Sequence, residues 1–108
     1  MSRYIISPEA SRDLNEITDY FATRNIDAGE QFVEDFDKKC RNLVKFPNIG
    51  RSYEELASSV RGIPIRGYII LYRALDNLIE IVRIVRGERD LPSLFLMRTS
   101  EIAGRLPQ

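Results

Sequence analysis

The sequence contains no histidine, no tryptophan and a single cysteine, Cys40, among its 108 residues. One thiol cannot form a disulfide within the chain, and the usual nitrogen and sulfur ligands of zinc are missing. We therefore expect no disulfide framework, no metal site and no cofactor, and a reducing, cytoplasmic setting. Histidine is also the side chain most often used for proton transfer near neutral pH, so its absence removes one common type of catalytic site.

Long apolar runs are missing as well. No stretch approaches the roughly 18 to 20 apolar residues that cross a bilayer, and residues 1–6 lack a basic segment followed by an apolar one. We expect a soluble protein without membrane association. The length suits a single domain, 1–108, with a core from 3 to 90 and a tail from 91 to 108.

The formal net charge is zero, which argues against a general nucleic-acid binder, and we expect no direct sequence-specific binding of nucleic acid. The two halves differ, however. Residues 1–56 carry eight basic and eleven acidic side chains, whereas residues 57–108 carry eight basic and five acidic ones. Two interpretations stay open: a merely solvated basic surface, or a basic groove for an acidic peptide or a phosphate backbone.

The first half of the sequence predicts a strand followed by two helices. Residues 3–6 are β-prone, and Ser7 followed by Pro8 is typical of a helix N-terminus. Spacings of four, three and four predict that one face of the first helix is buried. That face consists of Ala10, Leu14, Ile17 and Phe21.

The second helix is predicted to follow at once. Asn25 suits a left-handed C-terminal conformation, and Asp27 with Glu30 has the spacing of a capping box. The helix should end at Phe46, because the following proline disfavours helix at the residue before it. Its predicted apolar stripe is Phe32, Phe36, Cys40 and Leu43, with Val33 and Val44 beside it.

The second half predicts three strands, 60–65, 68–74 and 78–85, after a polar crossover at 48–59 that contains one helical turn at 54–57. Pro64 places the first of these strands at an edge or at a bulge. The last strand is apolar on both faces, which indicates a central position. The predicted fold is α+β, in the order β-α-α-β-β-β, with a helical hairpin packed on a small, mostly antiparallel sheet.

Every basic side chain between Val60 and Asp90 is an arginine, and a guanidinium group suits bidentate recognition of carboxylate or phosphate. These arginines are our candidates for binding a partner or target: Arg61, Arg66, Arg73, Arg83, Arg86 and Arg89. The alternative is that Arg61, Arg83 and Arg89 pair inside the domain with Asp13, Glu16, Glu80 or Asp90, while Arg66, Arg73 and Arg86 face solvent.

Several different short motifs follow one another along the chain. They lie at 4–10, 13–14, 16–17, 46–51, 60–61, 68–73, 79–85 and 89–90. In this order they resemble the ParE branch of the ParE/RelE toxin superfamily. The resemblance implies the β-α-α-β-β-β fold and the toxin role in a bacterial type II toxin–antitoxin pair. Arg61, Arg83 and Arg89 match recurrent positions of that family.

The RelE and ParE branches of this superfamily have different activities, and the resemblance to the superfamily therefore leaves two activities to compare. RelE-like toxins cleave messenger RNA on the ribosome, which requires a base and an acid. The C-terminal tyrosine or histidine typical of them is missing here, and only Glu80 or Glu88 would remain as a base. ParE-like toxins inhibit DNA gyrase by binding. We therefore expect no catalytic residue and a toxin that is not an enzyme, with the RelE-like ribonuclease and a non-toxic interaction module of the same fold as alternatives.

The resemblance also implies partners: a cognate antitoxin, DNA gyrase as the target, and assembly as a homodimer or a toxin–antitoxin hetero-oligomer. The tail, 91–108, is strongly apolar near its start and predicts a further short helix. Either the tail folds onto the core, or it binds the antitoxin or a second copy of the chain.

Overall fold

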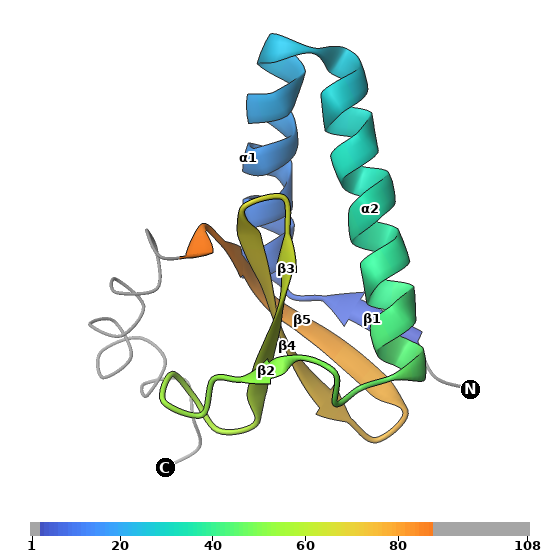
Figure 1. The fold of residues 1–108 in the computed structure, drawn as a ribbon, viewed down its shortest axis with the longest axis vertical. Helices are drawn as coiled ribbons and strands as arrows, with labels where there is room; N and C mark the ends of the chain where they lie inside the picture. Colours follow the sequence, from blue (N-terminus) through green and yellow to red (C-terminus); the bar gives the residue numbers. More distant parts are fainter. Residues whose placement is uncertain (1–2, 88–108) are drawn as a thin grey trace.

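The computed structural model describes residues 3–87, in which two helices pack on a five-stranded sheet (Figure 1). In chain order the elements are β1 (Arg3–Ile6), α1 (Pro8–Arg24), α2 (Ile26–Lys45), β2 (Arg51–Ser52), β3 (Val60–Ile65), β4 (Tyr68–Leu75) and β5 (Leu78–Val85). The α+β class and the helical hairpin on a mostly antiparallel sheet are confirmed. The predicted tail, 91–108, and the last three residues of the predicted core lie outside the described residues.

The strands lie in the order β1-β5-β4-β3-β2, with β1 parallel to β5 and every other pair antiparallel. β5 is therefore central, as its two apolar faces predicted. β2 was not predicted, because two residues are too short to show an alternating pattern. The segment 54–57 forms one isolated hydrogen-bonded turn, in which the amides of Leu56 and Ala57 both donate to the carbonyl of Tyr53, at 2.8 and 3.3 Å, as in a single turn of helix.

The edge position of Pro64 is confirmed, since β2 pairs only with Arg61 and Gly62 and leaves residues 63–65 of β3 paired with β4 alone. The irregularity in the sheet lies on β5. Tyr72 is opposite Ile81 and Leu71 is opposite Arg83, so Val82 is an extra residue. This bulge shifts the alternation of side chains by one position. As a result, β5 directs Ile79, Ile81 and Ile84 toward the helices.

The helix ends follow local side-chain chemistry. The hydroxyl of Ser7 accepts a hydrogen bond from the amide of Ala10 at 3.0 Å, as predicted for an N-cap. The prediction for Asn25 was wrong: its φ of −164° and ψ of 119° are extended, and its side chain accepts from the amide of Asp27 at 2.9 Å. Because the asparagine reaches the amide two residues ahead, it caps the second helix itself, and α2 begins at Ile26 rather than after Asp27.

The main core lies between the hairpin and the sheet. The predicted stripe on α2 is buried, and α1 adds two buried residues, Ala10 and Ile17. Burial raises the pKa of the Cys40 thiol to about 12, which fits a small buried hydrophobe. Val33 is an exception to the prediction, because 41% of it is exposed. On the opposite side of the sheet, the turn at 53–57 covers a smaller cluster that includes Leu71 and Val85.

We predict that Phe36→Ala destabilises the domain by roughly 3 to 5 kcal/mol, as large-to-small changes in a core do. Phe36 is 2% exposed and meets the ring of Tyr4 edge-on, with centroids 6.4 Å apart. Urea denaturation measures the loss. Val33→Ala, on the exposed side of the same helix, is the control and should change stability by no more than about 0.5 kcal/mol. Similar losses for both variants would contradict the assigned helix face.

Candidate functional site

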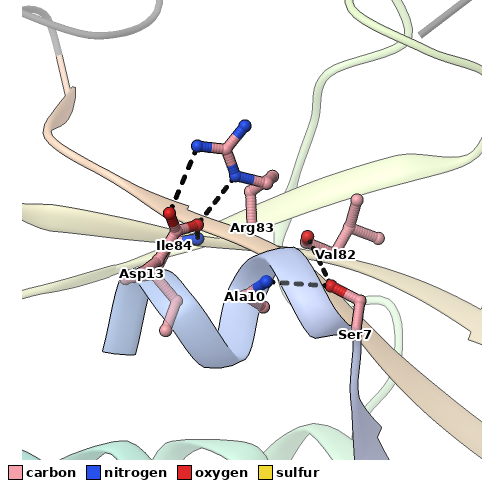
Figure 2. A network of polar contacts seen from close by, with 6 residues as sticks. All are labelled: Ser7, Ala10, Asp13, Val82, Arg83 and Ile84. Carbon is pink, nitrogen blue, oxygen red and sulfur yellow. Dashed lines mark hydrogen bonds and ion pairs between the residues drawn. The ribbon is translucent and has the colours of Figure 1, made fainter. Parts of the chain in front are cut away.

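Arg83, one of the six candidate arginines, is bound to α1 by a bidentate ion pair (Figure 2). Its Nε donates to Oδ2 of Asp13 at 2.7 Å, and its Nη2 donates to Oδ1 at 3.2 Å. The same carboxylate accepts the backbone amide of Ile84 at 2.9 Å. Both side chains are largely shielded from solvent, with 31% of Arg83 and 15% of Asp13 exposed. The internal pairing that the sequence left open is therefore present for this arginine.

The ion pair lies where β5 loses its neighbour strand. β1 ends at Ile6, opposite Ile81. Beyond that point Ser7 supplies the hydrogen bonds to β5. Its amide donates to the carbonyl of Ile81 at 3.0 Å. Its hydroxyl donates to the carbonyl of Val82 at 2.9 Å (Figure 2). Asp13 then takes the amide of Ile84. Ser7, the N-cap of α1, and the Asp13 side chain thus satisfy the backbone groups that a longer β1 would have bonded.

Arg61 is also used by the fold. Its Nη1 donates to the carbonyl of Gly50 at 2.8 Å and, more weakly, to that of Asn48 at 3.4 Å. Next to it, the hydroxyl of the fully buried Tyr72 donates to the carbonyl of Pro47 at 2.7 Å and accepts the amide of Gly50 at 3.0 Å. A side chain at Gly50 would come within 2.6 Å of this hydroxyl, so the close approach requires glycine.

These contacts give the hydroxyl of Tyr72 a structural role. Burial raises the pKa of its hydroxyl, and the nearby Gly50 amide and Arg61 offset this only in part. Both hydrogen-bonding capacities of the hydroxyl are engaged with backbone groups of the 47–50 segment. Tyr72 and Arg61 therefore hold that segment against the sheet.

Two further candidates form ion pairs closer to solvent. The Nε of Arg66 lies 2.6 Å from Oδ2 of Asp35 on α2, and both side chains are exposed. Arg73 faces Glu80 across β4 and β5, with 3.9 Å between Nη1 and Oε1. Arg66 faces solvent, as predicted. Arg73 was also predicted to face solvent, but it is half-buried.

Arg86 lies beside two aromatic rings, 5.6 Å from the ring centroid of Tyr20 and 5.8 Å from that of Tyr68. Arg24 lies over the same Tyr20 ring at 4.6 Å. The last candidate, Arg89, is outside the described residues. The arginines do not share one groove: by strand alternation Arg61 is on the helix side of the sheet, whereas Arg73 is on the opposite side.

The side of the sheet away from the helices leaves one area uncovered by the 53–57 turn. We call it the outer patch, and it consists of two cross-strand rows, Arg3-Leu78-Leu75 and Ile5-Glu80-Arg73. Ile5 is 42% exposed and Leu75 is 49% exposed. The outer patch therefore combines exposed aliphatic side chains with two arginines and one glutamate. The sequence indicated part of the outer patch through the alternation of side chains along β4 and β5. It did not reveal how these strands align with β1.

Sequence analysis also missed two apolar grooves that involve α2. One lies between α2 and β3 and is lined by Lys38, Lys39, Asn42, Ile49, Ile63 and Pro64. The other, which we call the hairpin groove, lies between α1 and α2 and includes Ile26 and Val33. The hairpin groove could have been inferred from the sequence, because Ile26 and Val33 are seven positions apart. They therefore share a face of α2 that is not the core stripe.

Residues 3–87 contain no group of three or more histidine, cysteine, aspartate or glutamate side chains arranged to hold a metal ion. Neither α1 nor α2, the two helices of this part of the chain, combines the length and the apolarity needed to cross a membrane.

The chain matches the model of a family described as the ParE toxin of the type II toxin–antitoxin system, parDE, over residues 4–91. Toxin ParE1 of Mycobacterium tuberculosis, in strains CDC 1551 / Oshkosh and ATCC 25618 / H37Rv, is 28% identical over 92 residues, which are 83% of this chain and 94% of the relative. A chain of the chromosomal ParDE TA system from P. aeruginosa is 24% identical, with a TM-score of 0.68 over 82% of this chain and 98% of the other. At that identity the structural likeness shows the fold alone.

We predict that Asp13→Ala costs about 1 to 3 kcal/mol of stability, because it removes the carboxylate that accepts the Ile84 amide and forms the bidentate ion pair with Arg83. Asp35→Ala, which removes the acid of the exposed pair with Arg66, should cost less than about 1 kcal/mol. Chemical denaturation of both variants checks the difference. If the two losses are equal, Asp13 does not have the structural role assigned to it.

Proposed function

This chain belongs to the ParE toxin family of type II toxin–antitoxin systems, and we propose from that premise that it inhibits DNA gyrase by binding it and is neutralised by a cognate antitoxin. The observation that carries the proposal is the family match over 4–91, which spans all but the first residue of the helices and strands. The proposed setting is the cytoplasm, where such a target and antitoxin would meet.

The state of the acidic and phenolic groups supports binding rather than catalysis. A ribonuclease of the RelE type must take a proton from a ribose hydroxyl and return one to the leaving oxygen. Tyr72 is buried and bonded on both sides of its hydroxyl. Glu80 faces Arg73 across the two strands, with 3.9 Å between Oε1 and Nη1, so its carboxylate already has an ion-pair partner within the sheet. Glu88, the other candidate base, is outside the described residues.

For the antitoxin, we propose an acidic and apolar segment that lies across the outer patch. Ile5 and Leu75 offer exposed aliphatic surface there, and Arg73 offers a guanidinium at the same level of the sheet. Contacts of this kind combine apolar burial with electrostatic steering. Arg66 and Arg86 are further candidate contacts, and Arg89 remains one from the sequence.

Arg61 and Arg83 have a different part in this proposal. Their guanidinium groups hold the 47–50 segment and the α1–β5 contact, so they contribute by shaping the domain on which the contacts lie. Substituting either one would confuse loss of folding with loss of binding. Tests of the binding surface therefore belong at Arg73.

We predict that Arg73→Gln weakens the complex with the cognate antitoxin about tenfold at low salt, and that the difference shrinks at high salt because the lost attraction is electrostatic. Glu80→Gln is the matched control, since it removes the opposite charge from the same cross-strand pair. It should leave the affinity unchanged or increase it. Calorimetric titration at two salt concentrations measures both, and a parallel loss in the two variants would rule out the outer patch as an acid-binding surface.

We also predict that toxicity survives the loss of each candidate base, because a protein that acts by binding needs no proton transfer. Glu80→Gln, Glu88→Gln and Tyr72→Phe should all arrest growth when expressed without the antitoxin, provided that each variant is folded. Plasmid supercoiling should fall or DNA breaks accumulate, while primer extension finds intact messages. Codon-periodic cuts in translated messages with normal supercoiling would instead establish the RelE-like activity.

A further inference from the structure

The hairpin groove lies toward the end of the hairpin where α1 meets α2, and this end extends beyond the sheet (Figure 1). Its apolar surface comes from Ala22 on α1 and from Ile26 and Val33 on α2, of which Ile26 is 70% and Val33 41% exposed. Gly29 forms part of the floor. A side chain there would come within 3.2 Å of the carbonyl oxygen of Thr18, so glycine lets the two helices lie close together.

This apolar surface is separate from the one that stabilises the fold. The core stripe of α2 faces the sheet, and Phe32 within it stacks on Phe21 of α1 with 5.4 Å between ring centroids. Ile26 and Val33 are seven residues apart, two helical turns, and so lie on one face with Gly29 between them. An apolar stripe beside a shallow interhelical groove has the form that receives an amphipathic helix.

Charge at the rim restricts what can occupy the groove. Of the described residues that line it, the two that carry charge are Glu30 and Glu34, both acidic. An acidic antitoxin segment would be repelled here. A second copy docked symmetrically through the same groove would bring its own Glu30 and Glu34 against these two, which like charges disfavour. A helix with lysine or arginine beside its apolar face would match both the apolar surface of the groove and its acidic rim.

We propose that the hairpin groove binds an amphipathic helix with basic flanks that belongs to the target protein, and that the outer patch is left to the antitoxin. This inference rests on the proposed function, since it takes the target to be DNA gyrase. The two surfaces differ in the sign of their charge. A substitution in one should therefore leave the partner of the other unaffected.

The test uses the double variant Glu30→Lys/Glu34→Lys, which reverses the rim, and Val33→Glu, which places a charge in the groove. Both positions of the rim and Val33 are exposed, so the variants should fold. Glu16→Lys is the matched control, because Glu16 is an exposed acid of α1 outside the groove. Purified toxin is titrated into a supercoiling assay with purified gyrase, and into the cognate antitoxin by calorimetry.

Both groove variants should need at least about ten times more toxin than the parent for half-maximal inhibition of gyrase, whereas the control and the antitoxin affinities should stay within about twofold. Inhibition by both groove variants at the parent's concentration would overturn the inference and leave the proposed function standing. A parent without effect on gyrase would overturn both. Sedimentation that shows a parent dimer lost in Val33→Glu would overturn the inference in favour of a second copy as the occupant.

Discussion

The arrangement of the domain depends on how the backbone amides and carbonyls of β5 are hydrogen-bonded beyond the end of β1. β1 is too short to pair with the whole of β5, and a central strand with unbonded amides and carbonyls would be costly. Ser7 and Asp13 supply the missing partners from the first turns of α1 (Figure 2). This ties α1 to the strand that follows it by about 70 residues. The helical hairpin is thereby fixed over one face of the sheet, and on the opposite face the 53–57 turn leaves the outer patch uncovered within residues 3–87.

The fixed hairpin separates two surfaces of opposite character. The sheet carries an open face with arginines among aliphatic side chains, and the hairpin carries an apolar groove with a glutamate rim. A net charge of zero conceals this division. Under the proposed function, such a division would let the antitoxin and the target be recognised by different parts of one small domain.

Local chemistry made most of the elements predictable. The cap at Ser7, the strands over 60–65 and 78–85, and the buried stripe of α2 all follow from short-range patterns, because capping, alternation and helical periodicity act within a few residues. One prediction failed where a residue could either end one helix or begin the next. Asn25 was expected to end one helix in a left-handed conformation, whereas it bonds forward to begin the next. β2 has too few residues to produce any pattern.

The sequence by itself determined that the chain has two amphipathic helices, a three-stranded meander with a central last strand, and arginine as its only cation between residues 60 and 90. Only the tertiary structure decided what the arginines do. Arg83 meets an aspartate 70 positions away, Arg61 meets backbone carbonyls, and Arg73 is half-buried opposite Glu80 on the side of the sheet away from the helices. Such pairings depend on strand register, on the bulge in β5 and on the path of α1, which together bring residues far apart in the sequence into contact.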